Sequence, residues 1–461
     1  MTLAALDGAP LATPMIPEPP LASLAHIPGT EGWPVIGSTL TLLRDPKGEV
    51  RRLAARFGPV FRTRAFGIRD VALLGPDANE FVLFDPAKIF SSAHGLSSFL
   101  ERLFPRNLLL LDFDEHRLHR KALSVAFRAG PMKSYLESLN RGIARGVAEW
   151  KSHAGEMRFY PAVKHLTLDL AAASFLGAEL GPEIAQLKRA FIDMVAAIVA
   201  VVRKPIPGTK MARGLKGRAF MVDYFGRQID ARRASDGADL FTHLCKATTD
   251  DGGLLTPEQI VDHMSFLMMA AHDTLTSSLA SFVWFLSKNP AWQSELRAEI
   301  SSLGLDKGEP LPYERLDDLP LTEMAYKESL RLIPPAPATS RCALRDTEFA
   351  GYKIPAGTRV SANILFTHHM PELWPEPETF DPLRFSAEAS RGRHKFAFAP
   401  FGGGAHMCLG LHFAYMQAKC FAYHLLSTTE VSVASGYDPG WRLWPIPQPR
   451  DGLLVRIAPL A

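Results

Sequence analysis

Residues 400–410 read PFGGGAHMCLG, which is the most informative stretch of the chain. Its single cysteine, Cys408, follows three successive glycines and comes just before residues 409–427, whose hydrophobic pattern predicts a helix. Glycine has no Cβ, so the backbone around the cysteine can lie close to a large planar ligand. Free N–H groups and the positive end of a helix both favour the thiolate. The stretch therefore predicts that Cys408 is a metal ligand; a buried free cysteine beside a glycine loop is the alternative.

Composition excludes several classes of protein. The chain has 461 residues, of which 47% are hydrophobic, enough for a large core. Lys and Arg number 51 against 48 Asp and Glu, and this near-neutral balance argues against a dedicated nucleic-acid binder. The four cysteines are scattered without a CxxC pair, which argues against a disulfide framework or a structural zinc site. Prolines break residues 1–27 into short pieces, so they predict an extended arm rather than a signal peptide or membrane anchor. We expect a soluble, cytoplasmic protein.

The sequence predicts a mainly α fold with a smaller β part built from both ends of the chain. Residues 112–335 show a helical pattern, and the longest expected helix covers 259–288. Thr256, with Glu258 close behind, predicts its capped start, and Asn289-Pro290 its end. This helix is apolar on nearly all sides, so we expect it inside the protein. The apolar run 190–202 contains an aspartate and predicts a buried or surface-docking helix.

Strands are expected on either side of this helical region. Residues 58–85 alternate like paired strands. Residues 348–365 predict a hairpin with its turn at Pro355-Ala356-Gly357, and 452–460 a closing strand. No linker or repeat divides the chain, so we expect the arm 1–27 followed by one domain, 28–461.

The glycine loop resembles the haem-binding loop of the cytochrome P450 family. The family pattern F-x-x-G-x-x-x-C-x-G is met by Phe401, Gly404, Cys408 and Gly410. His406 stands where the family usually has arginine; histidine can also donate a hydrogen bond to a haem propionate, with a charge that depends on pH. The resemblance implies haem b between the long central helix and the cysteine-loop helix, with Cys408 on the iron and the other four residues as cofactor contacts.

Two motifs that are similar to family signatures imply a structural triad. Glu328 and Arg331 in KESLR match the E-x-x-R pattern, and their spacing places both on one helix face. By itself this pattern is common on surface helices. FDPLRF resembles the family's meander motif, and its Arg384 would join Glu328 and Arg331 near the cysteine loop.

The stretch AAHDTL, 270–275, resembles the family's oxygen-activation motif, with Ala271 and Leu275 as departures. Asp273 and Thr274 lie in a very apolar helix, where polar groups are costly without partners. The structural interpretation is a threonine hydroxyl bonded to the preceding turn and an aspartate paired with a distant base. The resemblance implies instead a locally widened helix, with Asp273 and Thr274 as the catalytic proton relay.

Three further residues match the family's haem contacts. His116 and Arg120 are four residues apart on one predicted helix face, suited to an anionic propionate. Arg341 matches a strand position that bonds a propionate, with a surface strand arginine as the alternative. A metal pair of His116 with His119 is less favoured because no third ligand is evident, and His368-His369 predict packing or surface histidines.

Family positions also outline a substrate pocket of small or apolar residues. It comprises Leu96, Phe99, Phe266, Met269, Ala270, Ala338, Thr339 and Ile446. Such a lining favours a lipophilic substrate held by burial. Residues 205–220 resemble a loop of the sterol, retinoid and plant-hormone branch, so we expect an isoprenoid-derived or steroid-like substrate, with a fatty acid as the alternative.

The resemblance implies a haem-thiolate monooxygenase of the soluble bacterial type. No reductase-like segment follows the cysteine loop, so we expect electrons from NAD(P)H to arrive through a ferredoxin reductase and a ferredoxin. A basic face could dock the ferredoxin: Arg117, Lys121, Arg391, Arg393 and Lys395. A peroxygenase or isomerase of the same fold, and a non-catalytic haem-binding sensor, are the alternatives. The Asp273-Thr274 pair disfavours the first, and the lack of a signalling domain the second.

Overall fold

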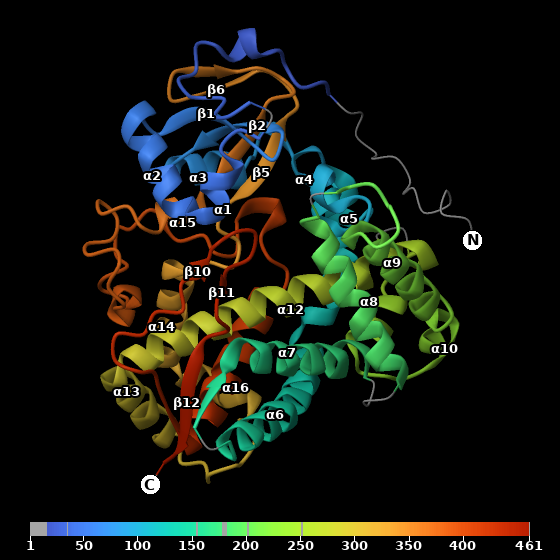
Figure 1. Ribbon diagram of the computed structural model, residues 1–461. Helices are drawn as coiled ribbons and strands as arrows, with labels where there is room; N and C mark the ends of the chain where they lie inside the picture. The colour runs from blue at the N-terminus through green and yellow to red at the C-terminus, as the bar shows by residue number, and fades with distance from the viewer. Residues whose placement is uncertain are drawn as a thin grey trace.

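One long helix, α12 (Pro257–Lys288), crosses the molecule and has other helices on both sides (Figure 1). The computed structural model describes residues 16–34, 36–153, 155–177, 182–200, 202–249 and 252–460. The Oγ1 atom of Thr256 accepts a hydrogen bond from Gln259 N, and the Gln259 side chain accepts one from Thr256 N. The predicted cap is therefore correct, although its partner is Gln259 rather than Glu258. The helix ends before Pro290, as the sequence predicts.

Most of the chain is helical, which confirms the expected fold class. Besides α12, the α-helices are α1 (Thr39–Arg44), α2 (Pro46–Phe57), α3 (Pro76–Leu83), α4 (Ser92–Leu100), α5 (Phe113–Ser124), α6 (Ala129–Lys151), α7 (Phe159–Leu176), α8 (Pro182–Ile198), α9 (Lys210–Gly226), α10 (Ile229–Ala234), α11 (Leu240–Cys245), α13 (Pro290–Ser301), α14 (Pro320–Leu332), α15 (Ile364–Thr367) and α16 (Leu411–Thr428). Short 3-10 helices are η2 (Leu21–Leu24), η3 (Leu108–Leu110), η4 (Val125–Phe127), η5 (Tyr313–Asp318), η6 (Pro382–Phe385), η7 (Lys395–Ala397) and η8 (Gly404–His406). No helix among the described residues is long and apolar enough to cross a membrane.

The strands form one larger sheet and three small ones. The five-stranded sheet has the order β1 (Val60–Ala65), β2 (Ile68–Leu73), β8 (Arg359–Ala362), β5 (Thr339–Ala343) and β3 (Phe90–Ser91). Only β2 and β8 pair in parallel in this sheet. The small sheets are β4 (Glu156–Arg158) with β12 (Leu454–Pro459) and β9 (Thr429–Ser432), β6 (Thr347–Phe349) with β7 (Tyr352–Ile354), and β10 (Trp441–Arg442) with β11 (Gln448–Pro449). Both ends of the chain contribute strands, as expected.

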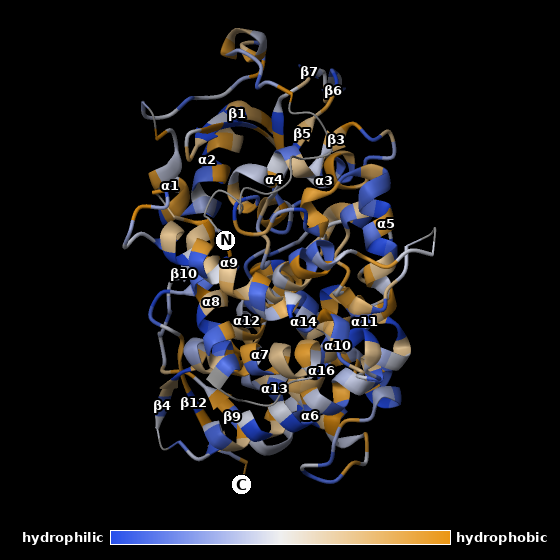
Figure 2. Cartoon of the chain, turned by 90° about the vertical axis from the view of Figure 1, so that its right-hand side faces the viewer, coloured by the Kyte–Doolittle hydropathy of each residue, from blue (hydrophilic) through white to orange (hydrophobic). Residues whose placement is uncertain are grey.

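Two large hydrophobic clusters hold these layers together. The larger one joins the helices around α12, including α6, whose buried Met132, Leu136, Leu139 and Ile143 recur at helical spacing. Figure 2 shows that α6 carries both hydrophilic and hydrophobic residues along its length. The smaller cluster packs the sheet against α3 and includes Ala399, which immediately precedes the glycine loop. The loop is thereby anchored to the sheet end of the molecule.

Two predicted strand regions differ from the structure. Residues 60–73 form the expected pair, but 76–83 form the helix α3, because Pro76 suits the first helical position. The hairpin of residues 347–354 turns at Ala350-Gly351, where φ is 50° and 81°. Such positive values match the tight turn of a two-residue hairpin. The predicted turn at 355–357 was wrong: these residues lead from β7 to β8 in another sheet.

Other expected elements lie close to their predicted bounds. The run 190–202 falls in α8, which ends at Ile198 and buries Phe191 and Met194; Val201 lies outside the described residues. In the N-terminal arm, residues 1–15 lie outside the described part. Residues 16–27 contain one 3-10 turn, and Leu24 and Ile27 are buried in the smaller cluster.

Candidate active site

The cysteine loop presents Cys408 between the 3-10 turn η8 and helix α16. The N–H of Cys408 donates to Phe401 O at 2.9 Å, and the Phe401 ring packs on Tyr415 of α16. Cys408 keeps accessible surface, whereas the other three cysteines are buried. The surrounding protein raises the pKa of the Cys408 thiol by desolvation, while the Gly410 N–H and the Arg120 guanidinium lower it. The loop thus places an accessible sulfur next to a donor and a cation.

The glycines of the loop serve two different purposes. Gly404 has a φ of 60°, and a Cβ there would lie 2.2 Å from Leu83 O at the end of α3. A Cβ at Gly403 would lie 2.5 Å from the Phe396 ring. Both glycines are therefore required by packing within the protein. A Cβ at Gly410 would meet only Phe127, at 3.9 Å, so this side of the loop is open. Contact of Gly404 with haem stays a prediction.

Two histidines stack beside the loop. The rings of His116, on α5, and His406 lie 4.0 Å apart between centroids. His116 Nε2 and His406 Nδ1 are buried and have no hydrogen-bond partner among the described residues. Burial, together with the charges of nearby Arg120 and Arg341, lowers the pKa of His116 to about 4. Burial also holds the pKa of His406 well below its usual value. Both rings are thus neutral, and each has a buried nitrogen that makes no hydrogen bond within the described part of the chain.

Two arginines complete a cluster of cations and donors. Arg341 on β5 is buried, and its guanidinium hydrogen-bonds only Thr339 Oγ1 and Ser340 O within the described part of the chain. Burial lowers the pKa of Arg341 to about 10. Arg120, partly buried on α5, likewise has its pKa lowered by desolvation, and the Cys408 charge raises it.

Asp112, an acid beside this cluster, is already hydrogen-bonded to other groups. Asp112 Oδ1 lies 4.0 Å from His406 Nε2, and the Asp112 carboxylate already accepts hydrogen bonds from Ser91 Oγ and Ser92 N. Buried donors without partners cost free energy unless a ligand satisfies them. The four residues therefore fit a ligand with anionic carboxylates next to Cys408, as haem propionates are.

The metal pair of His116 and His119 is not formed. His119 Nδ1 lies 2.7 Å from Nε2 of His263 on α12, a contact that ties α5 to the long helix. No group of three metal-ligating side chains occurs among the described residues.

The structure brings the predicted triad together. Arg331 Nε and Nη2 donate to the two carboxylate oxygens of Glu328 at 2.7 and 2.8 Å, and both side chains are fully buried. Arg384 Nε lies 3.4 Å from Glu328 Oε1. Arg331 Nη1 also donates to the carbonyls of His368 and Pro377, each at 2.8 Å. The triad thus fixes the irregular segment that leads to the cysteine loop.

His368 extends this network in a way that sequence reasoning missed. Its Nε2 accepts a hydrogen bond from Ala399 N at 3.1 Å, so its Nδ1 carries the hydrogen that it donates to Arg331 O at 3.2 Å. It therefore links α14 directly to the residue before the cysteine loop. The sequence analysis expected His368 and His369 to be packing or surface histidines, and the sequence around them contains no motif that indicates this link.

On α12, Asp273 and Thr274 make the contacts expected if both residues have a structural role. Thr274 Oγ1 donates to Ala270 O at 2.5 Å. Asp273 Oδ1 lies 3.2 Å from His272 Nδ1 and 3.6 Å from Lys164 Nζ on α7. Residues 257–288 are α-helical throughout, so the expected widening of the helix is absent from the structure. Thr274 is partly accessible and Asp273 is buried. A role of the two residues in proton transfer stays a prediction.

Five of the expected pocket residues belong to one hydrophobic cluster. Leu96 and Phe99 on α4, with Phe266, Met269 and Ala270 on α12, all pack in the larger core, and all but Phe266 are partly buried. The other three lie elsewhere in the fold. Ala338 precedes β5, Thr339 begins it, and Ile446 lies between β10 and β11, where Trp444 stacks on Phe66.

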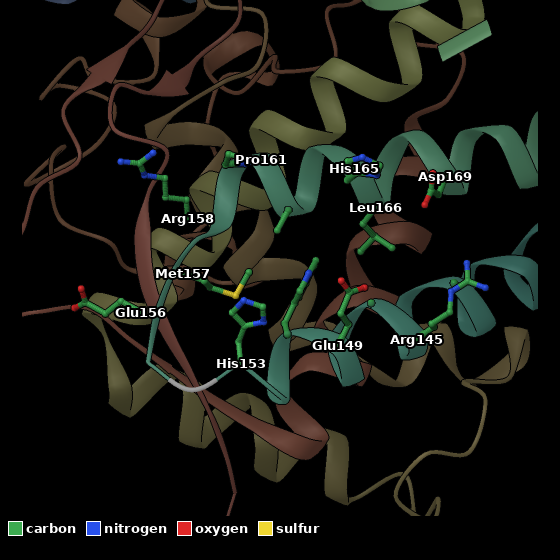
Figure 3. Close-up of a pocket in the computed structure, with 14 residues that line it drawn as sticks. Arg145, Glu149, His153, Glu156, Met157, Arg158, Pro161, His165, Leu166 and Asp169 are labelled. Carbon is green, nitrogen blue, oxygen red and sulfur yellow. The ribbon is translucent and has the colours of Figure 1, made fainter. Parts of the chain in front are cut away.

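A cavity lies outside this candidate site. It has a volume of about 580 Å³, lies between α6, β4 and α7, and contains none of the predicted site residues. Figure 3 shows Arg145, Glu149, His165 and Asp169 around it. These charges have both signs, and none of the four side chains is fully buried, so they do not define a ligand.

The site thus combines an accessible cysteine with nearby cations and buried histidine nitrogens that have no partner among the described residues. Residues 27–445 match the family model "Cytochrome P450", and the chain belongs to this family. Its enzymes are monooxygenases, which confirms the expected activity class. The family also implies haem, O₂, lipophilic substrates and redox partners.

Three similar proteins cover nearly the whole chain. A Mycobacterium tuberculosis protein named cytochrome P450 136 is 36% identical over 96% of this chain and 90% of its own length. The solved structure titled "Retinoic acid bound cyanobacterial CYP120A1" has a TM-score of 0.85 and 32% identity, covering 94% of this chain and 99% of that one. Taxane 10-beta-hydroxylase of Taxus cuspidata is 29% identical over 94% of this chain and 89% of its own length.

Proposed function

We propose that the chain binds haem b in one catalytic domain, residues 28–461 after the arm 1–27, and hydroxylates a lipophilic, isoprenoid-derived small molecule in the cytoplasm. The observation that carries this proposal is the cluster of His116, Arg120, Arg341 and His406 beside the accessible Cys408, in which two buried histidine nitrogens have no hydrogen-bond partner among the described residues. Cys408 would bind the iron and the cluster the propionates, with Phe401, Gly404 and Gly410 along the loop. Bound haem supplies the activation of O₂ and the hydroxylation chemistry, and the thiolate favours O–O cleavage.

The chain's own residues supply protons and a dry pocket in this proposal. Thr274 Oγ1 and the Asp273 carboxylate hold the protons that the reaction consumes. The hydroxyl of Thr274 donates to Ala270 O within its own helix. The apolar side chains of α4 and α12 exclude water and hold the substrate by burial.

The relatives support an isoprenoid-derived substrate. The cyanobacterial structure is described as retinoic acid bound, and the Taxus relative is named as a taxane hydroxylase. Retinoic acid and taxanes are both lipophilic terpenoids. The expected pocket residues are apolar or small, which suits this class of molecule.

We further propose a ferredoxin, reduced by a ferredoxin reductase with NAD(P)H, as the electron donor. Of the expected basic face, Arg117, Lys121, Arg391 and Lys395 are exposed. Arg393 is different: its guanidinium stacks 4.2 Å from the Trp374 ring centroid and donates to Arg384 O and Ala389 O. The proposed docking face therefore consists of the four exposed residues.

A ligand screen and a turnover assay test the proposal. We expect retinoic acid or a diterpene to shift the haem absorption band of the purified protein more strongly than a saturated fatty acid does. The reduced protein under carbon monoxide should show the band of a thiolate adduct, and Cys408→Ser should lose it. Turnover with ferredoxin, reductase and NADPH should give a hydroxylated product. Product formed only with hydrogen peroxide, or binding without any product, would contradict the proposal.

A further inference from the structure

His272 is held between two helices at the centre of the molecule. It is fully buried on α12, next to Asp273, and its ring packs edge-on against Phe191 of α8. Its Nε2 lies 3.1 Å from Lys164 O on α7. A carbonyl oxygen only accepts hydrogen bonds, so Nε2 must carry the hydrogen. The ring is therefore fixed in orientation, and its second nitrogen, Nδ1, is buried near Asp273 without a hydrogen-bond partner among the described residues.

This geometry determines where a proton lies. His272 Nδ1 is 3.2 Å from Asp273 Oδ1. Because Nε2 already carries a hydrogen, a neutral ring would turn the Nδ1 lone pair toward a carboxylate, and the two would repel each other. A proton between Nδ1 and the carboxylate removes this repulsion. One proton shared between the two groups would therefore relieve the repulsion in this buried pair.

The side chains of Asp273 and Thr274 have different partners. The Asp273 carboxylate faces α7, where Lys164 Nζ is 3.6 Å away, and its Oδ2 has no hydrogen-bond partner among the described residues. The Lys164 side chain is 36% exposed and reaches solvent. Thr274 bonds instead to Ala270 O.

We propose that His272 is a positioning residue of the proton relay, which holds the Asp273 carboxylate toward α7 and shares one proton with it. This inference rests on the proposed function. In this proposal the proton of the relay is held on the side of α12 that faces α7, close to the partly exposed side chain of Lys164.

The charges around Asp273 are consistent with this role. Burial raises the pKa of Asp273, but contact with His272 and with Lys164 outweighs burial and leaves it below its usual value. Tyr160, also on α7, is another titratable group near Asp273: burial, then the Asp273 charge, raises its pKa.

Carbon-13 NMR of the holoenzyme tests the effect on Asp273. Protein labelled at aspartate Cγ is titrated in its diamagnetic, carbon-monoxide-bound ferrous form, with Asp273→Asn to assign the signal. We expect His272→Phe to raise the titration midpoint of Asp273 by about 1 pH unit, the effect of losing a nearby opposite charge. His272→Gln, which keeps a donor for Lys164 O, should shift it in the same direction. His165→Phe, on the exposed side of α7, should leave it unchanged. An unchanged midpoint in the Gln variant overturns the proposal.

Nitrogen-15 NMR of labelled histidine tests the shared proton from the other side. In the wild type the His272 Nδ1 signal should be that of a protonated nitrogen. In Asp273→Asn it should move to the position of an unprotonated nitrogen, while the Nε2 signal stays in place. A Nδ1 signal unaffected by this change would refute the sharing. Neither measurement needs a substrate, so a failed ligand screen would count against the proposed function and leave this inference standing.

Discussion

At the residue scale, a few buried charges hold the segment that carries the cysteine. Glu328 and Arg331 are fully buried, and Arg331 donates to backbone carbonyls that are 37 to 48 residues further along the chain. Glu328 in turn accepts a hydrogen bond from Asp381 N at 3.0 Å. An irregular backbone segment lacks the regular hydrogen bonds of a helix or sheet. The side chains of Glu328 and Arg331 supply hydrogen-bond partners for its backbone groups instead. The triad is therefore structural, and its loss should be visible in stability.

Glu328→Gln should destabilise the protein strongly. It keeps the shape of the side chain but leaves the buried Arg331 without its counter-charge, which costs about 3–5 kcal/mol. Urea denaturation followed by circular dichroism measures the free energy of unfolding. Glu314→Gln is the matched control, because Glu314 pairs with Lys133 on the exposed surface and should leave the stability unchanged. Equal stability of the Glu328 variant and the wild type would show that Arg331 is satisfied by carbonyls alone.

At the element scale, the cysteine loop depends on the end of α3 as much as on its own sequence. Gly404 lies against the last residues of α3, and Asn79 of α3 donates to Phe396 O. The F-x-x-G-x-x-x-C-x-G pattern located the loop, yet it did not reveal this neighbour, because α3 is more than 300 residues away in sequence and its residues pattern like a strand. Local sequence patterns identify single helices, strands and loops. Contacts between residues of different elements become known only from the three-dimensional fold.

Gly404→Ala should disturb this contact, and Gly410→Ala should not. At Gly404 an added methyl group meets Leu83 O and the backbone keeps a φ of 60°, so we expect a loss of at least about 2 kcal/mol. At Gly410 the methyl group meets only Phe127 at 3.9 Å, and φ is −90°. Thermal denaturation of both variants gives the comparison. Similar melting temperatures would mean that α3 moves to accept the methyl group.

Asp70 on β2 should make stability depend on pH. Its carboxylate accepts a hydrogen bond from Ser361 Oγ on β8, and burial raises its pKa from 3.8 to about 6. Because the folded-state pKa is the higher one, this contribution to stability is fully present below pH 4 and is lost as pH rises through about 6. The loss approaches about 3 kcal/mol, because each tenfold change in the protonation equilibrium corresponds to about 1.4 kcal/mol. Asp70→Asn stays neutral, so its advantage over the wild type should grow between pH 4 and pH 7 in urea denaturation. A constant difference between the two proteins would refute the raised pKa.

At the scale of the whole molecule, the candidate site is assembled from distant parts of the chain. His116 and Arg120 come from α5, Arg341 from β5 and His406 from the cysteine loop. Family motifs predicted each of these residues, and the helix 257–288 followed from its apolar pattern and cap. The stacking of His116 on His406, the link through His368 and the His272–Asp273 contact could not be predicted, because they depend on side chains meeting across elements. The same holds for Arg393, which the sequence predicted to be part of the basic docking face and which instead stacks on the Trp374 ring.

The exposed cations of the proposed docking face lead to a prediction for electron transfer. Arg391 and Lys395 are exposed on the segment leading to the cysteine loop, and opposite charges on two proteins accelerate their encounter. Arg391→Glu combined with Lys395→Glu should lower the second-order rate constant of reduction by a ferredoxin about tenfold at low salt, and should weaken its dependence on ionic strength. Stopped-flow absorption of the haem measures both. Lys204→Glu, between α8 and α9, changes the charge of an exposed lysine on another segment and should leave the rate as it is. If both sets of variants are reduced at the wild-type rate, the donor docks on another surface.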